Sequence, residues 1–251
     1  AAPPVEEEMP AENHQAILNR LSELDQIEYD QIRKTEAKKL GIRATILDNE
    51  MAKLRGQKAA QETPFGTPVE PWPEPVDGVA HLDSIFETLK RFIAAKPEVL
   101  RAATLWTSFT WFIDDVRVAP LAIITSPEKR CGKTLLSTLM SRLCRDPLLA
   151  SSITPSALFR SIQKWKPTLI LDEADTFLKE NEDLRGLINS GHTQNTAFVI
   201  RCTGDNHEPT QFNTFGAKLL AGIGTLPETI MDRAVVLRLR RKKQDEKMER
   251  I

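Results

Sequence analysis

Cysteine is scarce in this chain of 251 residues, and so are the other marks of a secreted, zinc-binding or membrane protein. The three cysteines are scattered and form no Cys-x-x-Cys pair, which argues against structural zinc and favours a reducing compartment. The four histidines also lie far apart. The sequence does not open with a basic and then apolar leader, and no apolar run approaches the length that spans a membrane. We therefore expect a soluble, cytoplasmic protein with no membrane partner.

The sequence also lacks a large net charge of either sign. Its 34 Lys and Arg residues nearly balance its 35 Asp and Glu residues, so the formal net charge is -1. The chain as a whole is therefore not a polycation, and any contact with nucleic acid must come from local basic patches. Its length allows one sizeable domain together with a small one.

Proline is absent between residues 14 and 58 and frequent between residues 61 and 78, and this contrast divides the chain. Residues 1–13 are rich in Pro, Ala and Glu, and we expect a disordered tail there. Residues 14–60 place apolar residues at helical spacing and should form a small all-α module. Residues 61–78 should form an extended linker. Residues 79–251 remain for the larger domain.

The small module has a local surplus of positive charge. Between residues 31 and 58 there are eight Lys or Arg residues and three Asp or Glu residues. Around Gly41, a helix, a glycine turn and a second helix follow at a spacing that resembles a helix-turn-helix. The module is therefore a candidate for contact with DNA phosphates. A small docking or packing module with a solvated basic face is an equally good interpretation, and the sequence leaves the two open.

The larger domain alternates between strand-like and helix-like stretches. Two helices are expected first, at 82–95 and 97–113. Apolar strands are expected next at 120–125, 149–153, 167–172, 217–223 and 234–240. Helices are expected between them at 132–145, 155–165, 177–190 and 227–233. This alternation predicts an α/β fold with a parallel five-stranded sheet and helices on both faces. Two short strand-like runs at 196–202 and 209–214, around the polar tip 204–207, predict an inserted β-hairpin.

A phosphate-binding loop is indicated where the first apolar strand ends. Backbone N–H groups at a loop-to-helix junction hold phosphates well, and the helix dipole adds to this. Gly132 would let the backbone approach the β-phosphate, Lys133 would reach the β- and γ-phosphates, and the Thr134 hydroxyl would ligate Mg²⁺. The loop before them consists of Pro127, Glu128, Lys129, Arg130 and Cys131. Pro127 stands where this motif usually has its first glycine, so a chance Gly-Lys-Thr at a helix start is the alternative.

A second motif lies 40 residues downstream, where the apolar run Leu169–Leu171 ends in two acids. Asp172 at this strand end can hold the magnesium shell, and Glu173 can polarise an attacking water molecule. The alternative is an acidic helix cap, with Asp175 capping the next helix. A cap needs only one acid and does not predict Gly-Lys-Thr upstream. Together the two motifs predict binding and hydrolysis of ATP with Mg²⁺.

Two further residues are candidates for the same site. Arg233 precedes the last strand and could reach the γ-phosphate bound by a neighbouring subunit. Pairing with Asp232, or capping of a helix, is its structural alternative. Thr225 follows the strand at 217–223 and could sense the γ-phosphate, although it could equally be an ordinary turn residue.

Residues 70–241 resemble AAA-type ATPases. More narrowly, they resemble an uncharacterised family of bacterial and phage proteins, in which an ATPase domain accompanies the primase-like regions of mobile-element replication proteins. The segments that carry the resemblance are Ser126–Lys129 before Cys131–Thr134, Trp165–Thr168 leading into Asp172–Phe177, Leu184–Gly186, Asn189–His192, and Asp232–Arg233.

The resemblance implies a P-loop NTPase fold and a homo-oligomeric ring, usually of six subunits, in which Arg233 acts in trans. It also implies that the hairpin at 196–214 grips DNA, with Arg201, Asn206 and His207 as candidates. AAA proteins usually carry a helical lid after the last strand, and we expect this lid to be absent or truncated here. The basic run Arg238–Lys243 is expected to be a solvated face.

We therefore expect an ATP-hydrolysing motor, helicase-like, that acts on DNA during mobile-element or phage replication. An initiator or loader ATPase that does not unwind DNA is one alternative. A DNA-binding adaptor that uses ATP only as a switch is the other. The tetrapeptide Asp172–Asp175 spells Asp-Glu-Ala-Asp, but the helicases named for it need a second motor lobe, for which this chain has no room.

Overall fold

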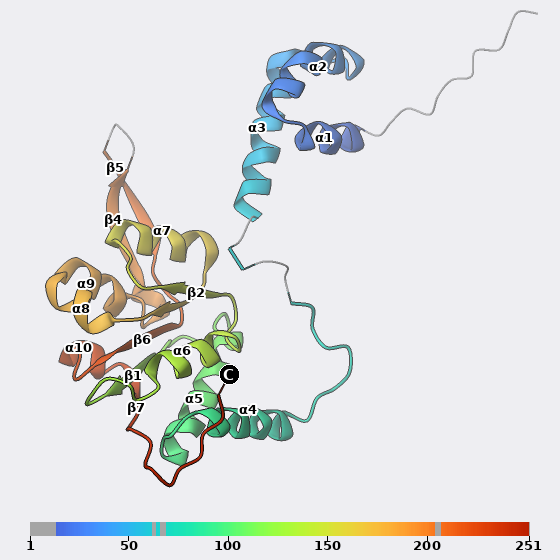
Figure 1. Ribbon diagram of the computed structural model, residues 1–251. Coiled ribbons are helices and arrows are strands. Elements are labelled where there is room, and N and C mark those ends of the chain that lie inside the picture. Colours follow the sequence, from blue (N-terminus) through green and yellow to red (C-terminus); the bar gives the residue numbers. More distant parts are fainter. Residues whose placement is uncertain (1–13, 62–63, 66–68, 204–206, 251) are drawn as a thin grey trace, which may run out of the picture. The chain divides into compact units, whose positions relative to one another are not determined.

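The computed structural model is drawn as a ribbon in Figure 1 and describes residues 14–61, 64–65, 69–203 and 207–250. The tail expected at 1–13 and the hairpin tip at 204–206 lie outside the described residues. The chain divides into two compact units, with the boundary between Thr63 and Pro64. Each unit has a hydrophobic core of its own.

The first unit consists of three helices, α1 (His14–Glu23), α2 (Gln26–Lys39) and α3 (Ala44–Gln61). Leu21, Leu47 and Met51 are buried between them. Gly41 ends α2 in the left-handed conformation (φ 68°), and the Ile42 N–H donates to the carbonyl of Ala37. This closing pattern satisfies the last carbonyls of the helix and reverses the chain into α3.

The second unit contains five parallel strands in the order β2-β3-β6-β1-β7. Their bounds are β1 (Leu121–Ser126), β2 (Pro147–Ala150), β3 (Thr168–Leu171), β6 (Lys218–Ile223) and β7 (Ala234–Arg238). The mixed α/β fold with a five-stranded parallel sheet, expected from the sequence, is confirmed. All strands end on the same side of the sheet, here called the carboxyl edge, and all begin at the opposite amino edge.

Helices cover both faces of this sheet (Figure 1). They are α4 (Gly78–Phe92), α5 (Pro97–Phe109), α6 (Lys133–Ser141), α7 (Pro155–Trp165), α8 (Ala174–Glu180), α9 (Glu182–Ser190) and α10 (Glu228–Met231), with 3₁₀ turns at Thr110–Phe112 and Gln194–Thr196. Along β1, Ala122 and Ile124 belong to the core beneath α4, α5 and α6, whereas Leu121 and Ile123 belong to the core beneath α7 to α10. Strand side chains alternate between faces, so a strand covered on both sides must be apolar throughout.

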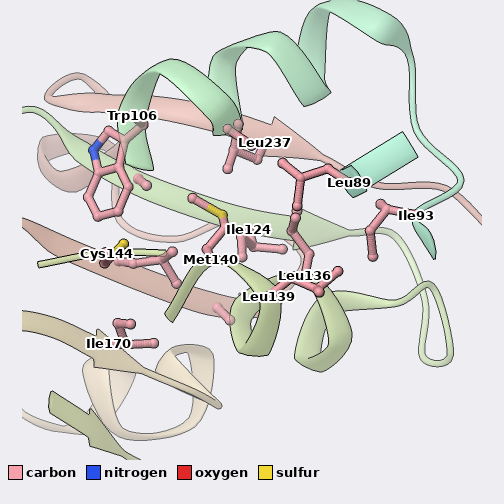
Figure 2. Packing of buried hydrophobic residues seen from close by; sticks show 14 of the residues in the cluster. Leu89, Ile93, Trp106, Ile124, Leu136, Leu139, Met140, Cys144, Ile170 and Leu237 are labelled. Carbon is pink, nitrogen blue, oxygen red and sulfur yellow. The ribbon is translucent and has the colours of Figure 1, made fainter. Parts of the chain in front are cut away.

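Figure 2 shows the first of these cores from close by. Ile124 and Leu237 from the sheet meet Leu136 and Met140 from α6, and Leu89 from α4 closes the cluster. This packing fixes the start of α6 against the end of β1. The loop between them is therefore held at both ends.

Several element boundaries differ from those expected. The helix expected at 177–190 is two helices, because Asn181 adopts an extended conformation and its side chain caps α9 by accepting from the Leu184 N–H at 2.9 Å. The strand expected at 149–153 lies at 147–150, because it follows its parallel register with β3, and residues 151–154 lead into α7 instead. The helix expected at 132–145 ends at Ser141, and the strand expected at 234–240 ends at Arg238.

The expected hairpin forms its own two-stranded antiparallel sheet, from β4 (Phe198–Thr203) and β5 (Glu208–Asn213). It is attached to α7, where the rings of Phe159 and Phe212 lie 4.6 Å apart. After β7, residues 239–250 form no helix or strand. Among the described helices, none is both long enough and apolar enough to cross a membrane.

Candidate functional site

The loop between β1 and α6 turns sharply at the carboxyl edge of the sheet. Arg130 and Gly132 both have positive φ, at 65° and 85°, and Gly132 is the residue at which α6 begins. A left-handed conformation is accessible to glycine and costs free energy for arginine. Pro127 to Arg130 are exposed, while Cys131 is buried in the core and anchors the loop from below. The exposed backbone of the loop thus surrounds the amino end of a helix, which is where anions bind favourably.

Lys133, the first residue of α6, extends back over this loop. Its ammonium donates to the Ser126 hydroxyl at 3.0 Å, and that hydroxyl donates to the carbonyl of Glu128 at 2.6 Å. No carboxylate of the described residues lies within 4.0 Å of the Lys133 ammonium. Sequence reasoning did not single out Ser126 as a functional residue. Its position as the last residue of the strand before the loop was the available signal.

The Thr134 hydroxyl donates to Oδ2 of Asp172 at 3.3 Å, which joins the two sequence motifs. The other oxygen of Asp172 accepts the N–H of Glu173 at 2.9 Å. Glu173 is exposed, has a φ of 56°, and begins α8. In the described residues its carboxylate has no hydrogen bond or ion pair. One acid therefore faces the Thr134 hydroxyl, and the next is free to bind something else.

A cavity of about 460 Å³ lies between the loop and the acids. Lys129, Arg130 and Lys133 contribute positive charge to its lining, and Asp172 and Glu173 contribute negative charge. The remaining lining residues are Thr134, Asp175, Thr176, Gly222 and Ile223. Because cations and anions line the same open cavity without pairing, the site suits a ligand that carries both signs, such as an anion with its metal ion.

Asp175, the third acid of the motif, does not cap α8. Its Oδ1 accepts the Ile223 N–H at 3.0 Å and so ties α8 to the end of β6. The approach is close, since a Cβ on Gly222 would lie 2.8 Å from the same oxygen. This contact keeps the acids at a fixed height beside β6, which lies between β3 and β1 in the sheet.

The donor set fits a magnesium ion. Thr134 Oγ1 and Asp172 Oδ2 are oxygen ligands 3.3 Å apart on the cavity wall. Adjacent ligands of an octahedral Mg²⁺ site, each about 2.1 Å from the ion, are about 3 Å apart. No cluster of three or more His, Cys, Asp or Glu side chains that could hold a metal occurs in the part of the chain that the structure describes. A divalent ion here would take its other ligands from phosphate and water, as Mg²⁺ commonly does.

Thr225 lies outside this cavity. It is exposed and lines a neighbouring cavity of about 230 Å³ together with Ser126, Pro127 and Arg238. That cavity lies on the other side of the loop's first residues. Thr225 is therefore placed near the site but not in contact with the residues that line it.

Arg233 lies at the amino edge of the sheet. Its carbonyl accepts the N–H of Leu121, the first residue of β1, and its guanidinium donates to the Thr229 carbonyl at 2.7 Å. Lys133 follows the opposite end of β1, about 16 Å away along a strand of this length. Arg233 is exposed and does not line the cavity of its own chain.

Arg201 of the hairpin is engaged within the chain. It pairs with Asp183 of α9 at 2.6 Å, and its guanidinium lies over the ring of Phe159. These contacts hold the hairpin on α7 and α9, so Arg201 is not free for an external phosphate. His207 is exposed with a φ of 53°, and Asn206 lies outside the described residues.

Sequence reasoning missed Lys218, which is buried at the amino edge. Its ammonium donates to the carbonyls of Thr214 and Gly216 at 2.9 and 3.0 Å, and to that of Gly191 at 3.5 Å. Burial lowers the pKa of Lys218 from its ordinary value of 10.5 to about 7. Burial, followed by the charges of Arg233 and Lys218, also lowers the pKa of nearby His192. The available signal was one lysine opening an apolar run.

Comparisons with protein-family models and with curated proteins find no match to this chain. The geometry of the cavity at the carboxyl edge is thus the main support for a function.

Proposed function

We propose that the chain is a magnesium-dependent ATPase of the P-loop, AAA-like type. The observation that carries the proposal is the 3.3 Å contact between the Thr134 hydroxyl and Asp172, at a cavity that Lys133 and Glu173 also line. A loop-to-helix junction that offers N–H groups, a lysine and a hydroxyl is suited to a triphosphate. An acid pair at the same cavity is what hydrolysis requires in addition to binding.

Each residue has a distinct role in this proposal. The backbone from Pro127 to Gly132 and the Lys133 ammonium bind the β- and γ-phosphates. Thr134 and Asp172 hold the magnesium ion, which neutralises phosphate charge when it is bound. Glu173, whose carboxylate has no other partner in the described residues, orients a water molecule and accepts its proton.

Replacing Glu173 by Gln tests this role directly. The variant keeps the size of the side chain and removes its basicity, so we expect ATP binding to persist and steady-state turnover to fall by about 10²- to 10⁴-fold. Glu228→Gln, an exposed acid outside the cavity, is the matched control. If wild type turns over no faster than Glu173→Gln, with and without DNA, the proposal fails.

We further propose that Arg233 acts on the cavity of a neighbouring copy. It is exposed and about 16 Å from the cavity of its own chain, so a contact with the γ-phosphate needs a second subunit. Size measurement of Glu173→Gln with ATP should show an oligomer, and the resemblance to AAA proteins favours a six-membered ring. A strict monomer would leave Arg233 with a structural role only.

The proposed substrate of the motor is DNA, and the corner between α2 and α3 is a candidate contact. Lys34, Lys38 and Arg43 are exposed there, and none has an acidic partner among the described residues. By contrast, Arg33 pairs with Asp48, and Lys39 pairs with the buried Glu36. Positive charge is thus left over on one part of the unit, as phosphate binding requires.

Lys34→Gln with Lys38→Gln should weaken DNA binding and reduce the salt dependence of binding by about two phosphate contacts. Lys39→Gln is the matched control, because its ammonium is already paired within the chain. Unchanged binding in the double variant would favour a docking module. DNA-stimulated ATP hydrolysis without strand separation would favour the loader alternative.

A further inference from the structure

An apolar groove follows the edge of the sheet that is farthest from β7. It lies between the edge strand β2 and α7 and has a volume of about 350 Å³. Leu148, Ala150, Ile153, Ala157 and Trp165 line it. Beside it, Leu149 of β2 is 57% exposed. A sheet edge and an apolar groove side by side form a surface that soluble proteins usually cover.

Two basic side chains border this groove. Arg160 and Lys164 are one helical turn apart on α7, and both belong to the groove lining. Arg160 lies over the rings of Phe159 and Phe212, and Lys164 lies over the ring of Trp165. Neither has a carboxylate within 4.0 Å in the described part of the chain. The groove therefore combines an apolar floor with unpaired positive charge.

The segment Val69–Val76, which precedes α4, has the opposite character. It contains Trp72, 74% exposed, between Glu70 and Glu74, and it contains no Lys or Arg. Both glutamates lack a cationic partner among the described residues. Val69 and Val76 are also exposed, by 76% and 58%. An exposed tryptophan leaves a large apolar surface in water, which favours its burial elsewhere.

The prolines of this segment prepare it for binding. Residues 71, 73 and 75 are proline, which restricts Glu70, Trp72 and Glu74 to extended backbone. Extended proline-rich segments dock in grooves lined by aromatic residues, and their limited freedom in solution lowers the entropy cost of docking. Trp165 supplies such an aromatic residue in the groove.

We propose that the Val69–Val76 segment of one copy of this chain docks in the β2–α7 groove of a second copy. Trp72 enters the apolar floor, and Glu70 and Glu74 pair with Arg160 and Lys164. The partner is a second copy because groove and segment complement each other in polarity and charge, yet the segment stays exposed within its own chain. The proposal does not depend on ATP hydrolysis.

A photo-cross-link tests which chain occupies the groove. A benzophenone amino acid replaces Trp72 in unlabelled full-length chain, which is mixed with ¹⁵N-labelled wild type and irradiated. We expect cross-links between the unlabelled segment and labelled peptides from residues 147–165. Cross-links confined to one chain, cross-links outside the groove, or a chain that stays monomeric would each overturn the proposal. The same probe at Val79, an equally exposed position on α4, is the control.

A charge exchange tests the contacts themselves by measuring self-association with sedimentation. Glu74→Lys and Lys164→Glu should each weaken association by about two- to fivefold, and the double variant should restore it. Trp72→Ala should weaken it by about tenfold or more, as expected for a central aromatic anchor. A double variant as weak as the sum of its single changes would contradict the pairing.

Discussion

Lys133 and Lys218 lie at opposite edges of the same sheet and differ in how their ammonium groups are satisfied. Lys133, at the carboxyl edge, lines a cavity of about 460 Å³ and has one hydrogen bond, to Ser126. Lys218, at the amino edge, is 1% exposed and donates to three carbonyls. Neither has a carboxylate within 4.0 Å among the described residues.

The difference shows why an unpaired lysine by itself does not mark a binding site. An ammonium has three donors. Lys218 uses all of them on the backbone around the base of the hairpin, so its function is structural. Lys133 keeps donors free and faces solvent, so a ligand can complete its hydrogen bonds. We expect changes at the carboxyl edge to alter activity and changes at the amino edge to alter stability.

The largest expected effect is at Lys133. Lys133→Met removes the proposed phosphate contact, and we expect kcat/KM for ATP to fall by about 10²- to 10³-fold. The free energy of unfolding should change by less than about 0.5 kcal/mol, because the side chain is not part of a packed core. ATPase kinetics and denaturant unfolding of the same samples check this. Lys242→Met, at an exposed lysine outside the cavity, is the control. A loss of stability matching the loss of rate would end the contrast between the two edges.

The next effect concerns pH and Lys218. The pKa of Lys218 is about 7 in the folded chain and 10.5 in the unfolded chain. Between these values the unfolded chain binds a proton that the folded chain does not, so stability rises with pH, by up to about 1.4 kcal/mol per pH unit. From pH 7 to pH 9 we expect wild type to gain about 2 kcal/mol relative to Lys218→Met, measured by urea unfolding. Below pH 7 the lysine is protonated in both states and this slope disappears.

Parallel pH profiles of wild type and Lys218→Met would contradict this prediction. They would mean that the three carbonyls keep the ammonium charged in the core. The buried thiol of Cys144, whose pKa is raised to about 12 by burial, lowers stability above pH 9 in both variants. The comparison is therefore made between pH 6 and pH 9.

The sheet could be predicted because local sequence determines it. Strands covered on both faces are apolar throughout, and the runs around Ile123, Ile170 and Leu220 show this directly. The proposed phosphate-binding residues are also contiguous in sequence, from Pro127 to Thr134. The parts that failed depend on contacts between distant residues. The Asp175 contact with Ile223, the Arg201 pair with Asp183 and the position of Thr225 are set by packing across the fold.

Gly191 and Gly186 give the finest test of the amino edge, because they lie five positions apart and should respond in opposite directions. A Cβ on Gly191 would lie 2.1 Å from both the Lys218 ammonium and the Thr214 carbonyl, whereas a Cβ on Gly186 would meet nothing within 4 Å. Gly191→Ala should destabilise the chain by about 1–3 kcal/mol through overpacking. Gly186→Ala, in the exposed middle of α9, should stabilise it by about 0.5–1 kcal/mol.

Urea unfolding of both variants, beside ATPase assays, separates the two edges of the sheet. ATP turnover should stay unchanged in Gly186→Ala and, at temperatures where the protein is folded, in Gly191→Ala. Equal and small effects of the two substitutions would mean that Lys218 can move aside without cost, and the amino edge would then be less rigid than its three carbonyl contacts indicate. A loss of turnover in folded Gly191→Ala would instead show that the packing at the hairpin base reaches the carboxyl edge through β6, the strand that begins at Lys218 and ends beside Asp175.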